Sequence, residues 1–179
     1  MKKTIGSFSL IVLLLVGSCG LINKLGQFYV DYNEQVTFAP QLPINVPITV
    51  YSPPINTNIE QTLQANNTNP KLVKSVKLNQ LTLTITSPQG QTFTFLQNIS
   101  AYISTDSLPE VEIASKQSIP DTVGAQLSLD INNVELKNYL LSNQVKLRIT
   151  CADKQMLGQQ VTVNIYSKFF VQANLLAAL

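Results

Sequence analysis

The residues best suited to chemistry in this 179-residue chain are its carboxylates, because the sequence contains no histidine. That absence excludes the Ser-His-Asp and Cys-His nucleophile arrangements and the His-Glu-x-x-His zinc motif. Glu110 and Glu112 lie two residues apart in an alternating segment, where both point to one face, as in a glycosidase pair or half of a calcium site. Val111 and Ile113 take the core side of that segment. We therefore expect both glutamates on the solvated face and assign no catalytic residue.

The rest of the sequence has no motif for a metal or a cofactor. No Asp-x-Asp-x-Asp-Gly calcium loop, glycine-rich phosphate loop or Gly-x-Ser-x-Gly elbow occurs. Cys151 alternates in phase with Leu147 and Ile149, and a free cysteine in that setting behaves as a small buried hydrophobic residue. A nucleophilic cysteine needs a basic or cationic activator. We therefore expect a protein that is not an enzyme and has no metal and no cofactor.

The first 18 residues have the features of a secretory signal peptide. Lys2 and Lys3 precede an apolar run at 8–16, which is shorter than the roughly 20 residues that a membrane-spanning helix needs. The sequence Val-Gly-Ser-Cys at 16–19 follows, and it resembles the lipobox of bacterial lipoproteins, in which signal peptidase II cuts before the cysteine. The resemblance implies that Cys19 carries acyl chains such as palmitate. An ordinary secretory leader with an incidental Cys19 is the alternative.

Removing this leader leaves a body with balanced charge. The chain has 12 basic and 10 acidic residues, and the two basic residues of the leader account for the difference. A neutral body lacks the basic surface that nucleic acid requires, so we expect membrane attachment through the lipid alone and no nucleic-acid partner. Gly20 and the residues after it include no acidic cluster. By resemblance to lipoprotein sorting signals, this favours the periplasmic face of the outer membrane.

The body begins with a predicted edge strand. Apolar residues occupy even positions throughout most of 36–50, which is typical of a half-buried strand. Pro43 and Pro47 both fall on odd positions, so the missing backbone donors lie along a single edge. We expect that edge to face solvent, with an unpaired polyproline-like linker as the alternative. Residues 19–35 lack sustained alternation and are assigned to a lipidated tether, although 28–30 could add a strand.

Repeated short alternating segments predict an all-β domain over 36–179. We expect an antiparallel two-sheet β-sandwich of immunoglobulin-like or jelly-roll type, with an up-and-down β-barrel as the alternative. Asn58 and Asn133 are positioned to cap two short helices. The later strands are predicted around 99–103, 111–113, 127–131, 145–151 and 161–165.

Two local features of the middle of the chain give specific expectations. The apolar positions of 72–85 change from even to odd, which predicts a bulge or a change of sheet at 79–80, because a strand cannot change face without an extra residue. The proline and glycine of 86–91 predict a turn. That turn is expected to close a hairpin onto a strand that bears Phe93 and Phe95.

The strand order and the polar-apolar texture of the body are similar to those of uncharacterised lipoproteins of Bacteroidota. The segments 77–85 and 91–96 carry this similarity, which extends over most of 70–171 and implies no activity. Ser107 and Thr122 each follow an aspartate and precede an apolar residue. This pattern resembles the O-glycosylation acceptor of Bacteroidota envelope proteins and makes both residues candidate glycosylation sites. An aspartate-capped turn is the alternative at each position.

These features favour a membrane-anchored, non-catalytic envelope lipoprotein that binds a protein partner or supports envelope assembly. A glycan- or lipid-binding module is the alternative. The segment 161–171 contains no proline, so as an edge strand it would offer both free backbone groups and an outward aromatic ring. We therefore expect a partner to dock near Tyr166 and Phe170, on the side opposite to Ile165 and Phe169.

Overall fold

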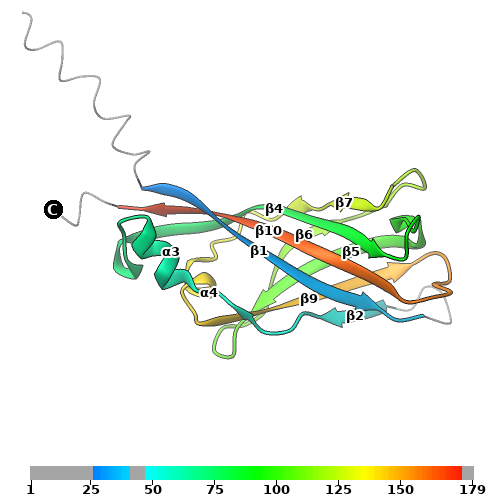
Figure 1. Ribbon diagram of the computed structural model, residues 1–179, viewed down its shortest axis with the longest axis horizontal. Coiled ribbons are helices and arrows are strands. Elements are labelled where there is room, and N and C mark those ends of the chain that lie inside the picture. The colour runs from blue at the N-terminus through cyan, green and yellow to red at the C-terminus, as the bar shows by residue number, and fades with distance from the viewer. Residues whose placement is uncertain (1–25, 41–46, 175–179) are drawn as a thin grey trace, which may run out of the picture.

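Two antiparallel sheets packed face to face form the body, in a computed structural model that describes residues 26–40 and 47–174 (Figure 1). In order, the first sheet contains β1 (Gln27–Phe38), β10 (Val161–Ala173), β4 (Val73–Ser87) and β7 (Gln126–Ser128). The second contains β2 (Pro47–Tyr51), β9 (Gln144–Asp153), β5 (Leu96–Ser104), β6 (Val111–Lys116) and β8 (Asp130–Ile131), and β3 (Ile55–Asn56) also pairs with β9. No backbone pairing among the described residues joins the sheets, which confirms the predicted sandwich.

The core lies between the sheets and follows from the alternation of the strands. Along β10 every second residue is buried, from Val161 to Ala173. In β5 the same rule buries Ile99, Ala101 and Ile103. Within the described residues, no helix has the length and apolar character required to cross a membrane.

Strand β1 corrects the predicted tether. It pairs with β10 along its whole length, from Gln27 opposite Gln172 to Phe38 opposite Val161. The sandwich therefore begins at residue 27 rather than at 36. The alternation was hidden because Glu34 occupies a half-buried position on the inward side, where an apolar residue is expected. The predicted signal peptide and the start of the predicted tether, including Cys19, lie outside the described residues.

The predicted strand 36–50 is divided between the two sheets. Strand β1 ends at Phe38 in the first sheet, and β2 begins at Pro47 in the second. Strand β2 pairs only with β9 among the described residues, so Pro47 does begin an edge strand, as predicted. Pro43 lies outside the described residues. The predicted strand at 127–131 is divided in the same way, into β7 of the first sheet and β8 of the second.

The bulge predicted in β4 is confirmed, but the prediction of a hairpin after it is wrong. Lys168 lies opposite Gln80 and Phe169 opposite Leu78, which leaves Asn79 as the extra residue. After the turn the chain crosses to β5 in the other sheet. Phe93 and Phe95 lie in a short 3₁₀ helix, η2 (Phe93–Phe95), which closes one end of the core with ring centroids 6.3 Å apart. Burial of two aromatic rings therefore does not require a strand, because a turn across the end of a core can also bury them.

The two α-helices of the described residues lie at the end of the sandwich where β1 begins (Figure 1). Helix α3 (Ile59–Ala65) starts directly after Asn58, as predicted, although the Asn58 side chain makes no capping hydrogen bond. A 3₁₀ turn, η1 (Pro70–Leu72), leads from α3 into β4. Helix α4 (Lys137–Leu140) begins later than predicted and is not capped by Asn133. Glu135 explains this, because its carboxylate accepts hydrogen bonds from Val76 N at 2.8 Å and Lys137 N at 2.9 Å and so ties the segment before the helix to β4.

Candidate functional site

The predicted side-chain faces of β10 are confirmed, but β10 does not lie at an edge of its sheet. Ile165 and Phe169 are buried in the core, whereas Tyr166 and Phe170 point outward and are half-buried. Strand β10, however, lies between β1 and β4 and is paired on both sides. A partner strand therefore cannot add to it. Alternation along one strand indicates which side chains face the core, but not which strands lie beside it.

An aromatic cluster nevertheless surrounds Phe170. Tyr29 of β1 lies opposite Phe170 in the register, and the two ring centroids are 5.4 Å apart. The Lys168 ammonium lies 4.5 Å from the centre of the Tyr29 ring, within cation–π range. Tyr29 is 50% exposed. We call Tyr29, Lys168 and Phe170 the Tyr29 cluster. Sequence reasoning missed Tyr29 because its strand was assigned to the tether, although the short apolar segment 28–30 was the available signal.

The remainder of this outer face is polar with few charges. Desolvation and the nearby Asp31 carboxylate together raise the pKa of the Tyr166 hydroxyl. Asn33 lies opposite Tyr166 and accepts a hydrogen bond from the Asn164 amide at 3.4 Å. The face thus carries mainly hydrogen-bonding side chains, with the Tyr29 cluster near the end where β1 begins.

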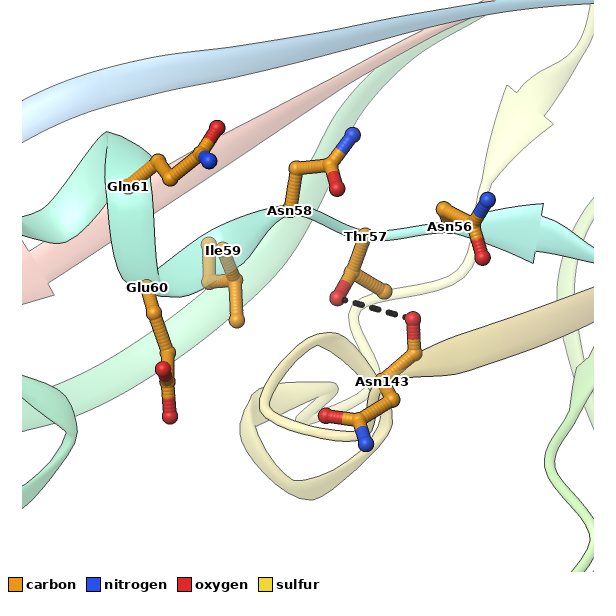
Figure 2. A pocket seen from close by; sticks show the side chains of 7 residues that line it. All are labelled: Asn56, Thr57, Asn58, Ile59, Glu60, Gln61 and Asn143. Atoms are coloured by element: carbon orange, nitrogen blue, oxygen red, sulfur yellow. Dashed lines mark hydrogen bonds between the residues drawn. The ribbon is translucent and has the colours of Figure 1, made fainter.

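An open pocket of about 290 Å³ lies at the start of α3. Apart from Ile59, its lining consists of amide and hydroxyl side chains, with Glu60 as the one ionisable group. The Thr57 hydroxyl donates to the carbonyls of Ser142 at 2.7 Å and Asn143 at 3.4 Å, which fixes one wall. Figure 2 shows the side chains of Asn58 and Asn143 pointing in different directions rather than converging. Without a second carboxylate, this pocket has no acid and base pair.

A neighbouring pocket of about 400 Å³ shares Asn56 and Asn143 with the first. Its one carboxylate belongs to Asp106, which lies 2.7 Å from Lys146 Nζ. The hydrogen bond from Lys146 lowers the pKa of Asp106. Asp106 is therefore an ionised partner of a lysine and not a proton donor near neutral pH.

Glu110 and Glu112 make separate contacts. Arg148 Nε donates to Glu110 Oε2 at 2.7 Å, and Nη2 of the same guanidinium binds the other oxygen. This hydrogen bonding lowers the pKa of Glu110 against the opposing effect of burial. Glu112 instead accepts a hydrogen bond from the Asn132 amide at 3.3 Å. The two carboxylates are thus engaged with different partners.

The inward side of β9 carries a cysteine and an aspartate. Cys151 is a buried free thiol, and burial, with the negative charge of Asp153 adding to it, raises its pKa to about 12. The thiolate is therefore scarce at neutral pH. Asp153 is fully buried, and neither carboxylate oxygen has a hydrogen-bond partner among the described residues. The same part of the chain contains no group of three potential metal ligands.

Both candidate glycosylation residues are exposed. Ser107 lies between β5 and β6, and Thr122 lies between β6 and β7. The aspartates before them are bound to lysines, Asp106 to Lys146 at 2.7 Å and Asp121 to Lys154 at 2.6 Å. Both hydroxyls are therefore accessible for modification.

No family model and no curated protein matches the chain. Among solved structures, it is similar to infectious bursal disease virus Gt strain (16% identity, TM-score 0.36), over 82% of this chain and 32% of that one. It is also similar to CpGH89CBM32-5 from Clostridium perfringens, solved in complex with GalNAc-beta-1,3-galactose (10% identity, TM-score 0.36), over 80% of this chain and 97% of that one. A third is Desmodium yellow mottle tymovirus (12% identity, TM-score 0.25), over 82% of both chains. Likenesses this weak give no information on function.

Proposed function

We propose that the chain is a lipid-anchored, non-catalytic protein of the cell envelope that binds a protein partner through the outer face of its first sheet. The Tyr29 cluster is the observation that carries this proposal. Tyr29 remains 50% exposed although it packs on Phe170, and Lys168 lies over its ring. Exposed aromatic residues with a polar tip dominate the binding energy of many protein interfaces. The same contact serves envelope assembly where the partner is a structural component.

The composition of this face favours a protein partner. The two polar pockets described above lie elsewhere, at the end that carries the helices. An exposed tyrosine beside a lysine and amide side chains gives a mixed apolar and polar surface, which a protein can cover while it removes the Tyr29 ring from water. Strand addition plays no part in this mode, because both edges of β10 are paired.

The proposed anchor places this cluster close to the membrane. Cys19 precedes Gln27 by eight residues, a length of chain that spans at most about 28 Å. Acyl chains on Cys19 would keep the start of β1 near the bilayer, because each buried methylene contributes about 0.8 kcal/mol to membrane binding. The favoured location is the periplasmic face of the outer membrane. A partner in or near that membrane is then within reach of the Tyr29 cluster.

Photocrosslinking in intact cells tests the proposal. A photoreactive phenylalanine analogue replaces Tyr29, and the matched control places it at Thr37, on the outward side of the same strand but at its far end. We expect a discrete protein adduct from position 29 that disappears in a Phe170→Ala background. Lipid adducts alone, or equal protein adducts from both positions, would contradict the proposal.

A further inference from the structure

A second surface lies on the outer face of the other sheet. The register of β2, β9 and β5 aligns Thr49, Thr150 and Ser100 in one row across the three strands. The adjacent row consists of Tyr51, Arg148 and Tyr102. Side chains two residues apart on a strand share a face, and the two rows are about 7 Å apart. We call these six residues the Arg148 strip.

Arg148 is held in one orientation at the centre of the strip. Its guanidinium carbon lies 4.2 Å from the centre of the Tyr102 ring. Glu110 binds its Nε and Nη2 atoms, and the Arg148 side chain keeps 22% of its surface exposed. A guanidinium has five N–H donors in a fixed plane, so donors remain for an external acceptor. Because its rotation is already restricted, Arg148 loses little conformational entropy on binding a ligand.

Tyr51 lies on the other side of Arg148. It belongs to the edge strand β2 and is 66% exposed, the highest exposure among the large hydrophobic residues of the described chain. Its ring is a free apolar surface beside the hydroxyl of Thr49 and the donors of Arg148. The strip thus combines an open aromatic face, planar donors and hydroxyl groups on a rigid sheet.

The charged groups around the strip are engaged within the protein. Glu110 pairs with Arg148, and Asp106 lies 2.7 Å from Lys146, the next outward residue of β9. Glu112, opposite Tyr102, accepts a hydrogen bond from the Asn132 amide. An anionic ligand would have to compete with these carboxylates. A neutral ligand would not.

We propose that the Arg148 strip binds a neutral glycan. In this arrangement the C–H face of a sugar ring packs on the electron-rich face of Tyr51. The sugar hydroxyls accept hydrogen bonds from Arg148 and both donate to and accept from the hydroxyls of Thr49 and Thr150. Three strands of the sheet span about 10 Å, enough for one or two sugar units. This site and the Tyr29 cluster lie on opposite outer faces of the sandwich. The glycan proposal and the protein-binding proposal can therefore be tested independently.

An array of immobilised neutral and acidic glycans, probed with the full mature chain, tests this site. We expect neutral glycans to be retained, and their affinity to fall about tenfold or more in Tyr51→Ala and in Arg148→Lys. Tyr29→Ala is the matched control, an exposed tyrosine of the other sheet, and should bind as the wild type does. Circular dichroism confirms that each variant is folded.

Three outcomes overturn the glycan proposal: no neutral glycan retained, acidic glycans retained alone, or retention unchanged in Tyr51→Ala. Glycan binding together with a protein adduct from position 29 that disappears in a Phe170→Ala background would support both proposals. Glycans retained by the wild type, with no protein adduct from position 29, would support the glycan site and overturn the proposed function.

Discussion

The hydroxyl of Tyr32 donates a hydrogen bond to the carbonyl oxygen of Thr57 at 2.7 Å, and this contact joins the two sheets on the side where both have an edge. Tyr32 belongs to β1 of the first sheet, and Thr57 lies between β3 and α3, beside the second. Burial raises the pKa of Tyr32 well above its ordinary value, so the hydroxyl stays protonated and able to donate. Thr57 also bonds to Ser142, which extends the connection to the segment before β9.

Tyr32→Phe should therefore destabilise the sandwich. The substitution keeps the ring and its edge-on contact with Phe169 but leaves the buried Thr57 carbonyl without its side-chain donor. We expect the free energy of unfolding to fall by about 1–2 kcal/mol in urea titrations. Tyr51→Phe, which removes an exposed hydroxyl, serves as the control and should change little. Equal effects of the two substitutions would show that the Tyr32 hydrogen bond adds nothing.

Asp153→Asn should instead stabilise the folded protein. A carboxylate buried without a partner carries a desolvation cost, and a neutral amide of the same shape carries less of it. We expect the free energy of unfolding at pH 7 to rise by about 1–3 kcal/mol. Asp121→Asn, at an exposed aspartate paired with Lys154, should be close to neutral. A loss of stability in Asp153→Asn would indicate that this carboxylate has a partner not visible among the described residues.

Glu34 should make stability depend on pH. It faces inward from β1, and burial raises its pKa in the folded state. The folded chain then binds this proton more tightly than the unfolded chain, so stability falls as the pH rises from the ordinary glutamate pKa through the raised folded-state pKa. Glu34→Gln should remove that part of the decline in urea unfolding midpoints. Glu60→Gln, at an exposed site, should leave the decline in place, and parallel curves for wild type and Glu34→Gln would refute the assignment.

The alternation of apolar and polar residues was sufficient to predict features of a single strand, namely the direction of its side chains and the position of a bulge. It placed Ile165 and Phe169 in the core and located the extra residue of β4 at Asn79, because side-chain direction reverses at every residue of a strand. It did not predict that β10 lies between two other strands, nor that β4 and β5 belong to different sheets. Strand order is decided by contacts between segments far apart in the chain, which no local period contains.

The candidate surfaces were hidden for the same reason. Tyr51 and Arg148 lie far apart in the sequence and become neighbours only through the pairing of β2 with β9. Tyr29 lies beside Phe170 only because β1 pairs with β10. The sequence also did not reveal how the edge strand of the first sheet is protected from pairing with another chain. Proline protects β2, whereas β1 has no proline and instead turns the charged Glu34 inward, another feature that discourages edge-to-edge pairing.

Cys19→Ala should release the chain from the membrane without unfolding it. The first strand begins at Gln27, so the substituted residue precedes every described contact of the sandwich. In cells labelled with an alkyne fatty acid, we expect the label on the wild type and none on Cys19→Ala, with the variant no longer sedimenting with membranes. Cys151→Ala is the matched control, since that thiol is buried in the core and should not accept an acyl chain. Label retained in Cys19→Ala, or lost in a folded Cys151→Ala, would refute lipidation at Cys19 and with it the anchor that brings the Tyr29 cluster to the membrane.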